Sequence, residues 1–162
     1  MTREERARKI ESYGRAYDLL VATLQDFPAE MWQFVPTPDR WSIHQLVVHI
    51  ADSEANSYIR CRRAIAEPGS AVMAYDENQW GKALNYHQQS TDDALELFKW
   101  LRLLSYKLIK TLPEPAWSQT IQHPENGTMT LDDWLEVYAA HVPEHIEQMR
   151  QNYADWRKLP AR

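Results

Sequence analysis

The stretch LDDWLEVYAAHVPEHIEQM, residues 131–149, predicts a long amphipathic helix. Its large apolar side chains recur every three to four positions and outline one helix face: Leu131, Trp134, Leu135, Tyr138, Val142 and Met149. A helix with such a stripe buries it against other helices. We therefore expect a helix at about 131–152 that forms one wall of a helical bundle, with Thr130 as its N-terminal cap.

Three further stretches show the same periodicity between helix start and stop signals. We expect these helices at residues 3–26, 43–66 and 91–111. Ser42 followed by Gln45 forms a capping box before the second of them. Only four glycines interrupt the chain, which also favours helix. Four helices of about twenty residues each predict an all-α four-helix bundle, formed by residues 1–162 as one domain.

Two segments between the helices are less regular. Residues 71–87 are expected to form a loop with a short helix near 76–84. The segment HPENGTMT, residues 123–130, contains Asn126-Gly127, a strong turn dipeptide, and could form a short hairpin. These longer connections leave room for a helix order that is not simply up and down.

Composition restricts the kinds of partner. The chain has 18 basic and 23 acidic residues, a formal net charge of −5, which disfavours nucleic acid and anionic membrane as partners. No stretch approaches the roughly 18 apolar residues of a membrane span, and the charged N-terminus has no signal core. We therefore expect a soluble, cytoplasmic protein. Cys61 is the only cysteine, so neither an intrachain disulfide nor a cysteine-based zinc site can form.

His141 and His145 lie four residues apart, on or beside the apolar stripe of the last helix. Four residues advance a helix by about 400°, so both rings project the same way, as two metal ligands on one helix do. Two pocket histidines bonded to core tyrosines would produce the same spacing. Pro143 between them frees the carbonyl of Ala139 and could bend the helix so that both rings aim at one point, or it could merely tolerate a bend.

A third ligand is expected on the second helix. His49 lies beside Leu46 and Ile50 on its buried side, whereas His44 is about 140° around the helix and points elsewhere. His87 precedes a helix cap and His123 lies in a turn, so both are expected to be exposed. The predicted metal ligands are therefore His49, His141 and His145. Three imidazoles suit Zn²⁺ or Ni²⁺, with open positions for water.

The segment HVPEH also matches H-x-x-E-H, an inverted zinc-protease signature in which Glu144 would be the general base. Only 17 residues follow His145, too few for the usual downstream acidic ligand. Glu144 also lies about 100° around the helix from His145. We therefore disfavour a protease.

Three motifs together resemble the DinB/YfiT-like superfamily. They are FVPTPDRWSIHQLVVHIADSE at 34–54, AYDENQW at 74–80 and WLEVYAAHVPEHIEQM at 134–149. The resemblance spans nearly the whole chain. It implies an up-down-down-up four-helix bundle, often a homodimer, that holds a divalent metal through three histidines. These correspond to His49, His141 and His145, the residues selected above from spacing.

The resemblance implies a small-molecule substrate but leaves the reaction open. Many members are described as metal-dependent hydrolases, which is our leading hypothesis. Others are thiol S-transferases that use bacillithiol or mycothiol, or a mycothiol-dependent isomerase. Some transferases carry a Ser-Arg-His type of spacer where this chain has Val-Pro-Glu, which weakens that hypothesis. A third hypothesis is a metal-binding stress-response protein without turnover.

Several charged residues could assist such a site. Asp76 and Glu77 could act as general base or orient water, or could be solvated loop acids. Asp52 lies three residues after the histidine of the second helix and could support it from behind, or could be a surface acid. Arg60 and Arg63 could bind an anionic substrate, although charged helix surface is the simpler interpretation.

Overall fold

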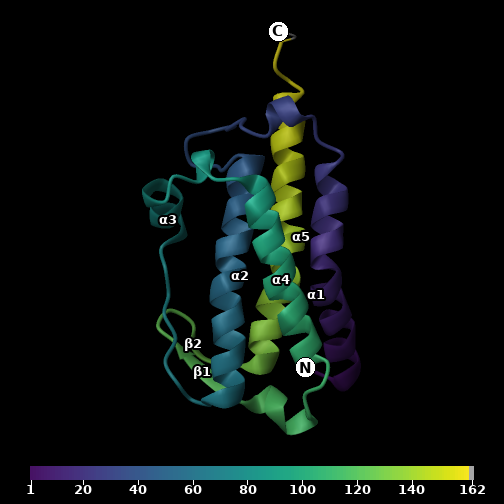
Figure 1. Cartoon of the computed structure of the whole chain (residues 1–162), viewed down its shortest axis with the longest axis vertical. Helices are drawn as coiled ribbons and strands as arrows, with labels where there is room; N and C mark the ends of the chain where they lie inside the picture. Colours follow the sequence, from purple (N-terminus) through teal and green to yellow (C-terminus); the bar gives the residue numbers. More distant parts are fainter. Residues whose placement is uncertain (161–162) are drawn as a thin grey trace.

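The computed structural model describes residues 1–160, and four long helices run along its long axis (Figure 1). These are α1 (Arg3–Leu24), α2 (Ile43–Ala66), α4 (Thr91–Ile109) and α5 (Leu131–Trp156). The shorter elements are α3 (Glu77–Ala83), strands β1 (Thr120–His123) and β2 (Gly127–Thr130), and 3₁₀ turns at Ala29–Met31, Tyr86–Gln88 and Glu114–Ser118. The predicted long helices are all present, with differences of at most four residues at their ends.

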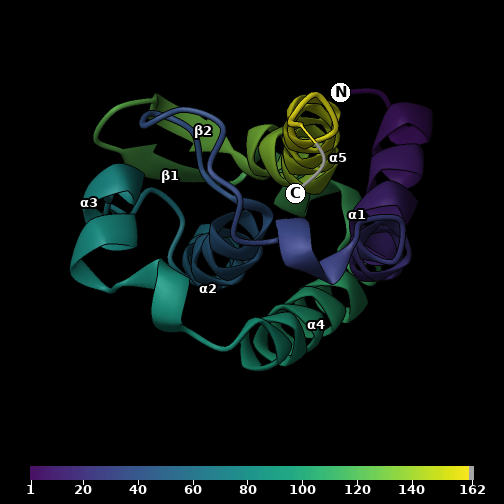
Figure 2. The same ribbon diagram turned by 90° about the horizontal axis from the view of Figure 1, so that it is seen from above.

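The four helices form a bundle with up-down-down-up order. Helices α1 and α5 run in one direction, and α2 and α4 run in the other (Figure 1). Both α1 and α2 pack against α4 and α5, so α1 lies diagonally opposite α2, and α4 lies diagonally opposite α5 (Figure 2). The segment between α2 and α4 returns along the outside of the bundle and carries α3. The predicted fold class is therefore confirmed.

Capping boxes fix the helix starts that the sequence indicated. The Ser42 hydroxyl accepts a hydrogen bond from the backbone N–H of Gln45, and the Gln45 side chain accepts one from the Ser42 N–H. Thr130 and Asp133 form the same arrangement before α5. Helix α5 continues through Pro143, and both α1 and α2 pack against this helix.

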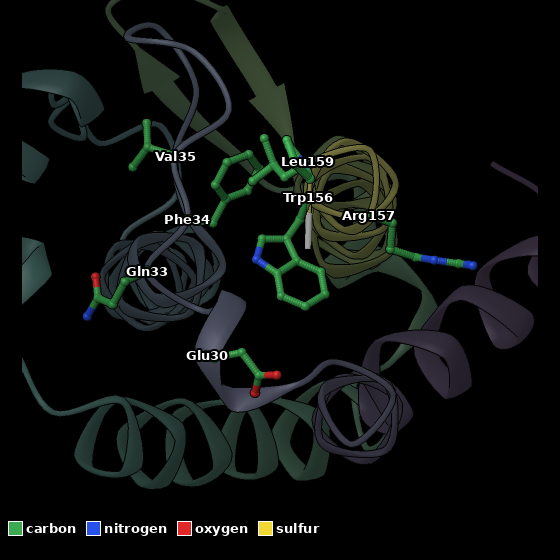
Figure 3. Close-up of a pocket in the computed structure, with 8 residues that line it drawn as sticks. Glu30, Gln33, Phe34, Val35, Trp156, Arg157 and Leu159 are labelled. Atoms are coloured by element: carbon green, nitrogen blue, oxygen red, sulfur yellow. The ribbon is translucent and has the colours of Figure 1, made fainter. Parts of the chain in front are cut away.

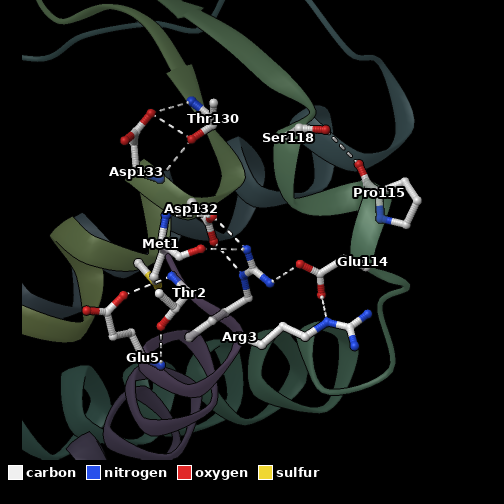
Figure 4. Close-up of polar contacts among 11 residues, drawn as sticks. Met1, Thr2, Arg3, Glu5, Glu114, Pro115, Ser118, Thr130, Asp132 and Asp133 are labelled. Carbon is white, nitrogen blue, oxygen red and sulfur yellow. Dashed lines mark hydrogen bonds and ion pairs between the residues drawn. The ribbon is translucent and has the colours of Figure 1, made fainter.

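A polar network joins the first turn of α1 to the first turn of α5 (Figure 4). The Arg6 guanidinium donates to both carboxylate oxygens of Asp132, at 2.6 and 2.8 Å, and to Glu114 at 2.7 Å. Two carboxylates beside one largely buried guanidinium raise the pKa of Arg6 above its ordinary value. The network therefore fixes the two parallel helices at one end of the bundle.

The predicted hairpin is present and packs onto α2. Strands β1 and β2 pair antiparallel with His123 opposite Gly127, and Gly127 adopts a φ of +69° at the turn. The expectation that His123 is exposed was wrong, because only 6% of it is accessible. Side chains alternate along a strand, so His123 shares the inward face of Ile121. Its Nδ1 accepts hydrogen bonds from the backbone N–H groups of Glu125 and Asn126.

A charged network that the sequence did not reveal lies inside the bundle. Glu54 of α2 and Arg102 of α4 are each 1% exposed and form an ion pair of 2.6 Å. The Tyr13 hydroxyl donates to the other oxygen of Glu54 at 2.5 Å, and Arg102 also donates to the backbone carbonyl of Tyr138 at 3.1 Å. Side chains from α1, α2 and α4 therefore meet the α5 backbone at one point.

One end of the bundle carries a groove between the segment after α1 and the end of α5 (Figure 3). Its lining residues are Glu30, Gln33, Phe34, Val35, Trp156, Arg157, Leu159 and Pro160. None of the histidines predicted as metal ligands contributes to it. Among residues 1–160, no helix has the length and apolar composition that crossing a membrane requires.

Candidate metal centre

Three histidines from two helices face one another inside the bundle. His49 comes from α2, and His141 and His145 come from α5, which packs against α2. Each ring offers a nitrogen, and these three nitrogens lie within 4.8 Å of one another. The Nε2 atoms of His141 and His145 are 3.0 Å apart. The structure therefore brings together the three residues that spacing selected.

His49 is the most deeply enclosed of the three, with none of its surface accessible. Neither of its ring nitrogens has a hydrogen-bond partner among the described residues. The Trp41 ring packs beside it at 4.7 Å between centroids and shields that side from water. A buried polar atom without a partner costs free energy, and both ring nitrogens therefore retain unused capacity to bind a ligand.

The neighbouring groups set the orientation and charge of the other two rings. The Gln148 side-chain oxygen lies 3.0 Å from His145 Nδ1 and can accept a hydrogen bond from the Nδ1–H, which leaves the Nε2 lone pair directed into the cluster. Burial lowers the pKa of His145 and lowers that of His141 further below its ordinary value. Burial lowers the pKa of His49 to about 3. All three rings are therefore neutral at pH 7, the form that ligates metal.

The two acids beside the cluster have different surroundings. Glu77 reaches to 4.0 Å between its Oε2 and His49 Nε2, and partial desolvation raises its pKa. The Asp76 carboxylate instead accepts a hydrogen bond from the Gln79 backbone N–H at 2.9 Å and caps α3. The cap explains why a short helix starts here and how it holds Glu77 near the histidines.

The remaining predicted residues make contacts that sequence reasoning did not identify. Asp52 accepts a hydrogen bond from the Tyr86 hydroxyl at 2.6 Å, so it anchors the segment before α4 rather than contacting a histidine of the cluster. Arg60 donates to the Tyr138 hydroxyl at 2.9 Å and to the Met73 carbonyl at 2.6 Å. Arg63 pairs with Glu67 on the surface of α2.

Two other histidines and Glu144 are not part of the cluster. His44 turns away from the cluster, and its Nδ1 lies 3.0 Å from the Gln33 amide nitrogen. His87 is exposed, as predicted. Glu144 is also exposed and is not one of the three clustered residues.

Comparison with known families identifies the chain. The family model described as "DinB superfamily" matches residues 12–149. The chain therefore belongs to the DinB superfamily. The match contains all three clustered histidines and all four long helices in whole or in part.

Relatives and a solved structure agree with this assignment. Proteins of Oceanobacillus iheyensis and Halalkalibacterium halodurans, both provisionally named metal-dependent hydrolases, are 30% identical over 65% and 68% of this chain. The chain spans only 61% and 64% of their lengths. The provisionally named metal-dependent hydrolase YfiT of Bacillus subtilis is 29% identical over 83% of this chain and 82% of its own.

The solved structure of YfiT from Bacillus subtilis superimposes with a TM-score of 0.89. The superposition covers 97% of this chain and 90% of YfiT at 23% identity. Its description names an unusual four-helix bundle topology, which is also the topology of this chain. At 23% sequence identity, this structural similarity shows that the two proteins share a fold.

Proposed function

We propose that the chain is a metal-dependent hydrolase of a small molecule, with His49, His141 and His145 as the ligands of one divalent ion. The observation that carries the proposal is the convergence of three neutral imidazoles, one of which has two buried nitrogens without a partner anywhere in residues 1–160. The provisional names of the relatives support the same class of reaction.

The donor set fits the proposed ion. Three imidazole nitrogens without a thiolate are typical of Zn²⁺ and Ni²⁺ sites that keep a position open for water or substrate. When bound, such an ion acidifies water and polarises a carbonyl or ester oxygen. Because the three imidazoles bring no negative charge, the site would retain the positive charge of the ion and attract anionic groups.

In this proposal the chain itself supplies a general base and an aromatic side chain that excludes water. Glu77 lies 4.0 Å from His49 and could take a proton from a water molecule beside it, and its raised pKa makes it a stronger base than an ordinary carboxylate. Trp41 packs against the His49 ring and excludes water from that side. Asp76 contributes indirectly, by starting the helix that carries Glu77.

Elemental analysis combined with an activity panel tests the proposal. Purified protein should hold about one Zn²⁺ or Ni²⁺ per chain, and replacing His49, His141 or His145 with Ala should reduce the content below half. Replacing His44 or His87 should leave it unchanged. Full metal content in the His49→Ala variant would refute the ligand assignment.

The panel should contain esters and amides, each with and without bacillithiol. Hydrolysis that needs the metal and Glu77, and no thiol, is the expected result, with Glu77→Gln at least 100-fold slower. Activity that requires the thiol would identify a thiol transferase instead. Full metal content with no turnover on the whole panel would favour the third hypothesis, a metal-binding stress-response protein.

A further inference from the structure

Arg60 of α2 is a partly buried arginine whose charge no carboxylate binds directly. Its terminal nitrogens donate to two uncharged acceptors, the Tyr138 hydroxyl at 2.9 Å and the Met73 carbonyl at 2.6 Å. Among residues 1–160, no carboxylate oxygen lies within 4.0 Å of the guanidinium, and its Nε is buried without an acceptor. Arg60 therefore keeps a positive charge and a donor that the described chain does not use.

Arg6 shows which anion completes such a guanidinium. Its Nε and one terminal nitrogen donate to the two oxygens of the Asp132 carboxylate, at 2.6 and 2.8 Å. Two parallel N–H donors match the two oxygens of a carboxylate, and these charge-assisted bonds are stronger than bonds to neutral acceptors. A carboxylate is therefore the group that suits Arg60. It can displace the Met73 carbonyl, which belongs to the irregular segment before α3.

Arg60 lies on the same face of α2 as His49. Eleven residues advance a helix by about 1100°, within about 20° of three full turns, and by about 16 Å. Side chains tilt toward the N-terminus of their helix, so the guanidinium reaches back toward His49. Its partner Tyr138 packs beside His141, with 6.1 Å between ring centroids. Burial raises the pKa of Glu77 and the charge of Arg60 opposes that rise, which also places the guanidinium near the histidine cluster.

We propose that Arg60 binds a carboxylate of the substrate. The substrate class is then a small molecule with a carboxylate at one end and the ester or amide bond that is hydrolysed at the other. This inference rests on the proposed hydrolase function and adds the substrate class to it. The bond to be cleaved lies at the three histidines, and the carboxylate does not react. Arg60 is a specificity residue, and Tyr138 positions its guanidinium.

Nuclear magnetic resonance of the arginine Nε–H groups tests carboxylate binding without turnover. Sodium glutarate added to the purified full chain should shift the Arg60 Nε signal, identified by its loss in Arg60→Gln, until the shift saturates. Dimethyl glutarate should not shift it. Arg63 is the matched control, because it lies on the same helix and already pairs with Glu67. An Arg60 signal that does not respond, or that sodium chloride of equal ionic strength shifts as much, overturns the proposal whether or not the chain is a hydrolase.

Matched esters test the specificity. The 4-nitrophenyl monoesters of succinate, glutarate and adipate keep a free carboxylate, and their methyl 4-nitrophenyl diesters do not. Arg60→Gln should lower kcat/KM for the best monoester at least about tenfold, mainly through KM, because it removes a charge-assisted bond. It should leave the diesters within about twofold, and Arg63→Gln should change neither.

The variant Arg60→Lys keeps the charge without the two parallel donors, so it should recover only part of the loss on the monoester. Equal losses on monoester and diester in Arg60→Gln would indicate a purely structural role and would overturn the proposal. If the wild type cleaves none of these esters, the hydrolase proposal fails for this substrate class, and the Nε titration alone decides whether Arg60 binds a carboxylate.

Discussion

Two buried polar clusters share helix α2, five residues apart, and they differ in how many of their polar atoms have hydrogen-bond partners. Glu54 accepts from both Tyr13 and Arg102, and the two terminal nitrogens of Arg102 have acceptors, although its Nε has none among residues 1–160. His49 is just as deeply buried, but within the same residues neither of its ring nitrogens has a partner. A cluster held by an ion pair and several hydrogen bonds specifies how helices pack, whereas ring nitrogens without partners can accept a ligand. We therefore interpret the Glu54 cluster as structural and the His49 cluster as the functional site.

The largest expected effect tests the structural cluster. Arg102→Met should reduce the free energy of unfolding by about 3–5 kcal/mol, because it leaves the Glu54 carboxylate buried without its cation. Urea denaturation followed by dichroism measures this change. The double variant Glu54→Leu/Arg102→Met should lose clearly less than Arg102→Met alone, since no buried charge remains. Equal losses would mean that packing, not charge, dominates there.

Metal removal should have a smaller effect on the fold. Metal at a free concentration a hundredfold above its dissociation constant stabilises the folded state by about 2.7 kcal/mol. For a chain of this size, chelation should lower the melting temperature by about 5–10 °C. The helical dichroism signal should persist at 25 °C, because the four helices bury their own apolar stripes. Unfolding on chelation at 25 °C would instead assign the histidines a structural role.

Replacing His49 in the metal-free protein tests whether its unpaired ring nitrogens lower the stability of the fold. His49→Leu should change the free energy of unfolding by no more than about 1 kcal/mol, or even increase it, because the substitution removes two unpaired buried nitrogens at similar volume. Thermal denaturation with a chelator measures this effect. Adding Zn²⁺ should then leave the melting temperature unchanged, whereas the His44→Ala control should retain the metal-dependent rise.

The smallest effect concerns His123, a buried histidine whose Nδ1 does have partners. Burial lowers its pKa, so the unfolded chain, with a histidine pKa of about 6.5, binds the proton more readily than the folded one. Stability should therefore fall as the pH drops below about 6.5. His123→Gln should reduce this loss by at most about 1 kcal/mol between pH 7.5 and 5.5, measured by urea denaturation at each pH. An identical pH dependence in both proteins would contradict this.

Local sequence signals were sufficient for much of the fold. The capping residues Ser42 and Thr130 and the dipeptide Asn126-Gly127 lie where the helices and the hairpin turn were predicted. The order of the helices in space came from the resemblance to a family rather than from periodicity. Periodicity defines which face of a helix is buried but not which helix covers it.

The sequence by itself determined which histidines could converge. Spacing of four on α5 and the apolar neighbours of His49 sufficed for that, because both are properties of a single helix. Only the tertiary structure decided that Glu77 approaches His49 while its neighbour Asp76 caps a helix, and that His123 is buried. It also decided that Glu54 pairs with Arg102, 48 residues away. These contacts join segments distant along the chain, and their positions depend on how whole helices pack, which no local pattern encodes.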